Sequence, residues 1–223
     1  MTVERPILFS APMVRALLDG SKTQTRRVMN PQPEPIPPDV QRMKPYDDSG
    51  YWWSCAKAQQ MVSMHDAHCL SPYGFERDRL WVRETWMQLY DSGNGGLTCL
   101  VPSGEASQIA LRRAKYRATD KPPENFAAKW KPSIFMPRWA SRITLEVAEV
   151  RCQRLQDISE EDAKAEGVEI ANGHPELGAI IGAGPSYREG FAQLWREING
   201  KRPGCAWSDN PWLWCVSFRR LKP

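Results

Sequence analysis

The chain has 223 residues, of which 41% are hydrophobic and 10% aromatic, and its formal net charge is +4. These values are ordinary for a globular protein, so we expect one domain over residues 1–223. No apolar run approaches the length of a membrane span, and MTVERPILFS lacks the hydrophobic core of an export signal. We therefore expect a cytoplasmic protein that does not enter a membrane.

The basic residues are mostly arginines, which suit bidentate contact with phosphate and stacking on bases. A nucleic acid or nucleotide is thus a reasonable partner, although a solvated basic surface is an equal alternative. The cysteines are scattered and fit free thiols in a reducing compartment. The tightest group of metal-ligating types lacks a C-x-x-C knuckle, so we predict no metal and no cofactor; its members are Cys55, His65, His68 and Cys69.

The first predicted elements are a strand at residues 7–9 and a helix that begins after Ser10 as N-cap. Pro12 is tolerated in the first helical turn, and Gly20 supplies the left-handed residue that ends the helix. The polar stretch DGSKTQTRRVMN, residues 19–30, follows directly. Because the helix holds it on one side, this stretch is a candidate for a positioned site.

Two segments read as insertions, at about residues 31–70 and 91–105. The first contains PQPEPIPPDV and few apolar residues, and the second begins with the turn-rich DSGNGG. Between and after them, alternation of apolar and polar residues predicts strands, with the core face clearest at Ile143, Leu145 and Val147. The strand segments are 77–86, 110–119, 142–155 and 210–221.

Two helices are expected near the end of the chain. Ser159 is the N-cap of the first, with Asp162 three residues on as in a capping box, and Gly167 ends it. The second covers residues 187–200 with an apolar face of Phe191, Leu194, Trp195 and Ile198. The glycine-rich segment 173–186 lacks the context of a phosphate loop. Trp139, Trp212 and Trp214 are expected in the core.

The strands are separated by turns rather than by regular crossover helices. This order argues against a doubly wound parallel sheet and predicts an α+β fold, with a small mixed sheet curled into a barrel and helices at its rim.

Three segments in this order resemble the ASCH domain of the PUA-like superfamily: ILFSAPMVRALLDGSKTQTRR, RDRLWVRETW and ISEEDAKAEGV, followed by the strand WLWCVSFRRL. The segment KWKPSIFMPRWASRI is similar to an enlarged form common in bacteriophages and prophages. The resemblance implies a PUA-like mixed β-barrel with flanking helices, and a cleft beside it for RNA or a nucleotide-like ligand.

Small members of that family deacylate cytidine that carries an acetyl group on its exocyclic amine. The resemblance places their catalytic lysine, threonine and glutamate at Lys22, Thr25 and Glu166. We expect Thr23, Arg26, Arg27 and Arg83 to contact the ligand.

The chemistry needs these residue types. A threonine hydroxyl becomes a nucleophile when a base takes its proton, and a lysine is such a base only if burial or a nearby cation lowers its pKa. Arg26 and Arg27 are candidates for that cation, and Arg26 or a main-chain amide for stabilising the oxyanion. Glu166 would protonate the leaving amine or orient water. Because side chains alternate along a strand, Lys22 and Thr25 can meet only if the motif bends after Gly20.

Three functions remain open from the sequence: an amidohydrolase acting on an acylated nucleoside, a non-catalytic RNA-binding module, and a single-strand ribonuclease. The structural alternative is that the threonines cap the helix and begin the strand, and that Glu166 is a solvated helix-end acid. A two-histidine nuclease mechanism is disfavoured because the histidines fall outside the matched motifs; they are His65, His68 and His174. The oligomeric state is not indicated.

Overall fold

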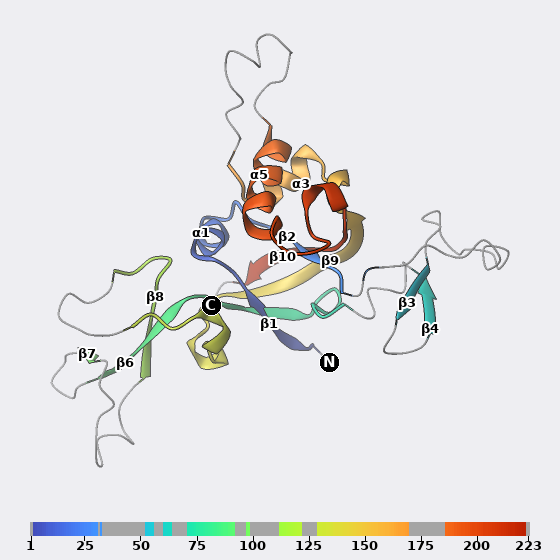
Figure 1. Ribbon diagram of the computed structural model, residues 1–223. Helices are drawn as coiled ribbons and strands as arrows, with labels where there is room; N and C mark the ends of the chain where they lie inside the picture. Colours follow the sequence, from blue (N-terminus) through green and yellow to red (C-terminus); the bar gives the residue numbers. More distant parts are fainter. Residues whose placement is uncertain are drawn as a thin grey trace, which may run out of the picture.

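The protein is described from a computed structural model (Figure 1). The description covers residues 2–30, 32, 52–55, 60–63, 71–91, 97–98, 112–121, 129–169 and 186–221. Most of the two expected insertions and the glycine-rich segment therefore lie outside the described residues, as do the side chains of the Cys55, His65, His68 and Cys69 group.

A five-stranded mixed sheet forms the centre of the fold, in the order β1-β5-β9-β10-β2. Its β1 and β5 are parallel, and the other neighbouring pairs are antiparallel. The strands are β1 (Glu4–Leu8), β5 (Arg79–Arg83), β9 (Thr144–Arg154), β10 (Trp212–Leu221) and β2 (Gln24–Val28).

Two smaller sheets accompany the central one. One pairs β3 (Trp52–Cys55) with β4 (Gln60–Ser63); the other has the order β7-β6-β8 and comprises β7 (Leu97–Thr98), β6 (Trp86–Asp91) and β8 (Arg112–Tyr116).

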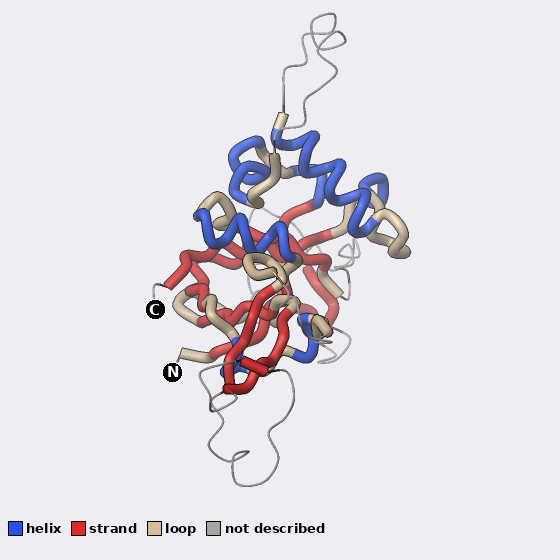
Figure 2. The backbone as a smooth tube through the Cα atoms, turned by 90° about the vertical axis from the view of Figure 1, so that its left-hand side faces the viewer, coloured by secondary structure: helices blue, strands red, loops and turns tan. Residues whose placement is uncertain are grey.

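The helices are α1 (Ala11–Asp19), α3 (Glu160–Ala165) and α5 (Tyr187–Asn199). Figure 2 shows them gathered above the strands. Short 3-10 turns occur at η2 (Ser133–Phe135), η3 (Arg138–Ala140), η4 (Leu155–Asp157) and η5 (Trp207–Asp209). In the described part of the chain, no helix combines the length and apolar character needed to cross a membrane.

The predicted α+β class and the mixed sheet are confirmed. A closed barrel is not detected among the described residues, in which β1 and β2 are the outer strands of the central sheet. The predicted first strand is displaced, because pairing with β5 extends from Glu4 to Leu8.

Strand β10 is buried on both faces, and this arrangement places the helices. Trp214 and Val216 pack into a core with Val14 and Leu17 of α1, whereas Cys215 points into a second core. The second core contains Ala163 of α3 and, from α5, Phe191 and Trp195. Because neighbouring residues of a strand point to opposite faces, β10 separates the α1 side from the α3 and α5 side.

Two predictions about apolar side chains are wrong. Ile198 was placed on the inward face of its helix, but it is 52% exposed in the last turn of α5. Trp139 was placed in the core and is 44% exposed, although the edge of its ring meets Trp86. Trp212 and Trp214 are buried, as predicted.

Candidate functional site

The motif after α1 meets the end of α3. Gly20 adopts a left-handed φ of 87°, which ends α1, and the Lys22 amide donates to the Ala16 carbonyl at 2.9 Å. Lys22 then forms an isolated antiparallel bridge with Glu166, next to the hydrogen bond from the Thr23 amide to the Ala165 carbonyl. Segments far apart in the sequence therefore touch through their backbones.

Gly167 permits this close approach. Its φ is +73°, and a Cβ added to it would lie 2.9 Å from the Cβ of Lys22 and 3.0 Å from that of Ala16. Any other residue would meet both neighbours and adopt a strained backbone conformation. The glycine predicted as a helix stop thus also makes room for the lysine.

The Lys22 side chain is buried against the Glu166 carboxylate. Its Nζ donates to Oε2 of Glu166 at 2.7 Å and to the Glu166 carbonyl at 2.8 Å. Burial lowers the pKa of Lys22 below its ordinary value of 10.5, and attraction to Glu166 opposes this only in part. The positive charges of Arg27 and Arg26 lower that pKa further.

Glu166 is shared between two cations. Arg26 donates through Nη1 to Oε1 of Glu166 at 3.3 Å and through Nη2 to Oδ2 of Asp162 at 2.7 Å. Gln153 accepts a further hydrogen bond from Nη2 at 3.0 Å. Arg26 is therefore a buried support for Glu166, whereas the sequence suggested a donor for the oxyanion.

Asp162 has a larger role than capping its helix. It accepts from Arg151 at 2.7 Å on each carboxylate oxygen, besides its contact with Arg26. Burial raises the pKa of Asp162, but the hydrogen bonds and charges of Arg151 and Arg26 outweigh this and hold it below its usual range. The carboxylate thus links α3 to both β2 and β9.

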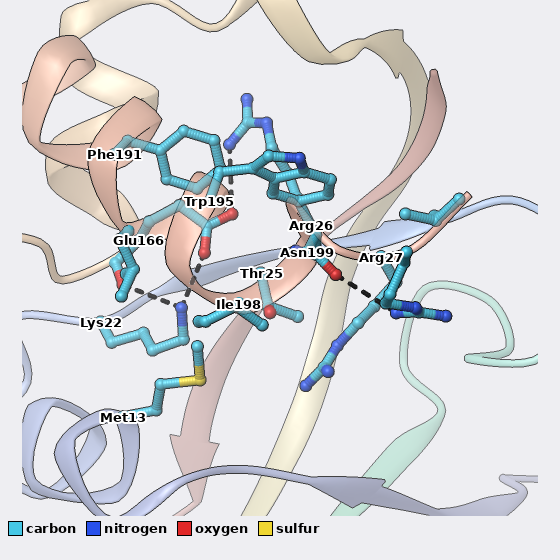
Figure 3. A pocket seen from close by; sticks show the side chains of 13 residues that line it. Met13, Lys22, Thr25, Arg26, Arg27, Glu166, Phe191, Trp195, Ile198 and Asn199 are labelled. Carbon is cyan, nitrogen blue, oxygen red and sulfur yellow. Dashed lines mark hydrogen bonds and ion pairs between the residues drawn. The ribbon is translucent and has the colours of Figure 1, made fainter. Parts of the chain in front are cut away.

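Lys22, Arg26 and Glu166 border one pocket with a cavity volume of about 130 Å³. Figure 3 shows Lys22 and Arg27 on opposite sides of it, with Thr25 between them in that view and Phe191 and Trp195 above. The described lining residues are Met13, Lys22, Thr25, Arg26, Arg27, Val28, Glu166, Phe191, Leu194, Trp195, Ile198, Asn199 and Arg202.

Lys22, Thr25 and Glu166 all line this pocket. Thr25 is 2% exposed and lies opposite Val216 in the β2–β10 pairing. Regular strand structure begins at Gln24, and the side chains of Lys22 and Arg26 both reach the Glu166 carboxylate. The bend expected to bring Lys22 and Thr25 together stays a prediction.

Of the four residues predicted to contact the ligand, two line the pocket and two do not. Arg26 and Arg27 line the pocket; Arg27 donates to the Leu8 carbonyl at 2.6 Å and its guanidinium lies 5.3 Å from the centre of the Phe9 ring. Thr23 is exposed and does not line this pocket. Arg83 lies elsewhere, where it donates to the carbonyls of Ile134 and Met136.

Sequence reasoning missed the contribution of α5. Phe191 and Trp195 were interpreted as core, and they both pack in the core and line the pocket. Asn199 and Arg202 were not singled out; Arg202 donates to Asn199 Oδ1 at 3.2 Å at the pocket wall. No local signal marks them, because their place depends on how α5 packs against β2.

In the part of the chain that is described, no group of three or more histidine, cysteine or acidic side chains is arranged to hold a metal ion. Comparison of the chain with known protein families, curated proteins and solved structures found no match.

Proposed function

We propose that this protein is an amidohydrolase that removes an acyl group from the exocyclic amine of cytidine, with Lys22, Thr25 and Glu166 as its catalytic residues. The observation that carries the proposal is a buried lysine of lowered pKa that shares a pocket with a threonine and is held by a glutamate. Such a lysine is a suitable base for activating a hydroxyl.

The reaction follows from these groups. Neutral Lys22 takes the proton of the Thr25 hydroxyl while its Oγ1 attacks the acyl carbonyl, which gives a tetrahedral intermediate. The C–N bond then breaks, Lys22 returns the proton to the leaving amine, and the acyl group remains on Thr25 as an ester. Water oriented by Glu166 attacks the ester and releases the carboxylic acid, which regenerates the threonine hydroxyl.

The pocket suits a small planar group. Cavities of roughly 150 Å³ hold a benzene ring, and the cavity here is about 130 Å³. Phe191 and Trp195 on its wall offer aromatic surface to a pyrimidine ring. A sugar attached to that ring would lie at the mouth of the pocket.

The same proposal includes membership of the ASCH group and its PUA-like barrel. It is supported by the order of the motifs and by the contact between GSKTQTRR and the end of ISEEDAKAEGV, seen in the Lys22–Glu166 bridge. The mixed sheet with helices beside it is compatible with that architecture.

A non-catalytic RNA-binding module is the second candidate. The described pocket lining contains four basic side chains, Lys22, Arg26, Arg27 and Arg202, against the single carboxylate of Glu166. Such a surplus attracts phosphate and gives binding that weakens steeply with salt.

The deciding experiment is an assay of acid release from N4-acetylcytidine. We expect turnover by the natural protein, and a loss of at least about 1,000-fold in kcat for Thr25→Ala, as when a nucleophile is removed. Thr23→Ala is the matched control, because Thr23 belongs to the same motif but is exposed and outside the pocket lining.

Two outcomes would contradict the hydrolase. One is full turnover by Thr25→Ala; the other is absence of acid release together with tight, salt-dependent retention of RNA, which would favour the binding module. Shortening of labelled single-stranded RNA, abolished in Lys22→Ala, would instead indicate a ribonuclease.

A further inference from the structure

A second hollow adjoins the pocket. Its cavity volume is about 380 Å³, and Val28 and Arg202 line both spaces. The remaining described walls come from the segment after β2 and from the loop after α5: Met29, Asn30, Gln32, Pro203, Gly204 and Cys205. The pocket that holds the proposed catalytic residues and the larger hollow therefore share a wall at Val28 and Arg202.

The walls of this hollow are held firmly. Gln32 is fixed at both ends of its amide, because Nε2 donates to the Met29 carbonyl at 2.7 Å and Oε1 accepts from the Trp212 amide at 2.7 Å. Gly204 has a left-handed φ of +67°, and open space surrounds the position where its Cβ would lie. Gln32 is thus a fixed part of the wall of the hollow, and Gly204 borders open space.

Two arginines of the first pocket keep uncompensated charge, and of these two only Arg202 also lines the second hollow. Arg27 and Arg202 bind neutral oxygens, the Leu8 carbonyl and the Asn199 amide oxygen. Within the described residues, neither forms an ion pair with a carboxylate, unlike Arg26 and Arg151. An anion is the group that would satisfy the remaining donors of Arg202.

The size of the first pocket determines what can lie in the second. A cavity of about 130 Å³ holds a single ring but not a complete nucleotide. If the acylated base occupies it, the ribose and its phosphate must lie outside, and the neighbouring hollow offers the adjoining space. Guanidinium groups are well matched to phosphate oxygens.

We propose that this hollow is a phosphate subsite, in which Arg202 binds the phosphate of a nucleotide whose base lies in the first pocket. This inference rests on the proposed function for the identity of the base. It narrows the substrate from a nucleoside to a phosphorylated form, either a free nucleotide or a residue within RNA.

The test is equilibrium binding, followed by quenching of tryptophan fluorescence, with cytidine and its 3′- and 5′-monophosphates as probes. We expect one monophosphate to bind about tenfold or more tightly than cytidine at low salt. Arg202→Gln should remove most of that advantage, measured as the ratio of the affinities for the monophosphate and for cytidine in the same variant. Lys201→Gln is the matched control, since Lys201 is exposed, lies next to Arg202 and does not line either space.

Equal affinity for cytidine and both monophosphates would overturn the proposal, as would a phosphate advantage that survives in Arg202→Gln. A short RNA that binds more tightly than the monophosphates, and does so through Arg202, would place the phosphate in a polynucleotide; weaker binding would place it in a free nucleotide. Because binding is measured without turnover, failure of acid release with an intact phosphate advantage would reject only the hydrolase. Acid release without that advantage would reject only the subsite.

Discussion

Lys22 and Glu166 are two charges removed from water, and such burial is costly unless each ion is well paired. Glu166 is paired with Arg26 as well as with Lys22. Its carboxylate therefore keeps one cationic partner if the other is lost. Loss of the Lys22 proton would therefore still leave Glu166 paired with Arg26.

We expect Lys22→Met to lower the free energy of unfolding by about 3 kcal/mol, since a buried ion pair loses one partner. Denaturant titration measures the change. Lys201→Met, at an exposed position, should change stability by less than about 0.5 kcal/mol. Equal effects of the two substitutions would show that the Lys22 pair contributes nothing beyond a surface charge.

The protonation of Lys22 should also appear in the pH dependence of turnover. Only neutral Lys22 can act as the base, so kcat/KM should rise with pH, with a midpoint below the ordinary lysine value of 10.5. NMR titration of the lysine side chains, with the Lys22 signal assigned by its loss in Lys22→Met, measures the same pKa without turnover. A midpoint at or above 10.5 would contradict the lowered pKa.

The pocket residues could be predicted from the sequence where they belong to a recognisable motif. The spacing in GSKTQTRR and the glutamate before Gly167 indicated Lys22, Thr25 and Glu166, and these side chains do share a pocket. The ion pair of Arg26 with Asp162 was not predicted, because Asp162 lies in a helix distant in the sequence. No property of the sequence near Arg202 shows that it stands between two hollows.

At the level of elements, the contact between α3 and the segment before β2 depends on one glycine. Gly167→Ala should lower the free energy of unfolding by about 3 kcal/mol, combining left-handed strain of about 1 kcal/mol with overpacking against Lys22 and Ala16. Gly204→Ala carries similar strain but meets open space, so about 1 kcal/mol is expected. Thermal or denaturant unfolding of both variants gives the difference.

The difference between the two losses of stability measures the cost of the steric contact at Gly167, because both variants share the strain of a left-handed backbone. If Gly204→Ala destabilises the protein as much as Gly167→Ala, the close approach at Lys22 is not what requires glycine. A decrease in turnover confined to Gly167→Ala would further connect this contact with the position of the lysine.

The elements themselves were largely predictable, because periodicity and helix signals are local. The alternation of Leu145 and Val147 identified β9, and Ser159 was identified as the cap of α3, where its side chain accepts from the Asp162 amide. The exposed Ile198 shows the limit of this reasoning. Its spacing is typical of an inward face, yet the last turn of α5 extends past the core and borders the pocket.

At the scale of the whole molecule, two aspartates join segments that are distant in sequence. Asp162 binds Arg26, and Asp78 accepts from Arg5 at 2.7 Å and from the Val3 amide at 2.9 Å. For Asp78 too, burial raises the pKa, but the hydrogen bonds from Val3 and Arg5 outweigh it and leave the pKa below 3.8. Both carboxylates therefore favour the folded state in their charged form.

We expect the free energy of unfolding to be insensitive to these groups above the ordinary aspartate pKa of 3.8, and to fall as the pH drops through their lowered folded-state values. Asp162→Asn should lower stability by about 1–3 kcal/mol at neutral pH and make this acid loss shallower. Denaturant titrations across the acid range measure both. Glu161→Gln, exposed on the same helix, should leave the slope unchanged; a matching change there would refute the assignment to Asp162.

The arrangement of the strands was the least predictable feature. Adjacent elements in sequence suggested a small curled sheet, but β2 pairs with β10 and β1 pairs with β5, across long intervals of chain. Such pairings join segments far apart in the chain, and the local pattern of either strand does not specify its partner.

The pairing of β2 with β10 has a consequence for synthesis on the ribosome. The motif that carries Lys22 emerges early, whereas Glu166, the α5 wall and the strand that aligns Thr25 emerge much later. A nascent chain halted before α3 would present Lys22 without Glu166 or the α5 wall of the pocket. Whatever chemistry the pocket performs is thus timed to the end of translation of these segments.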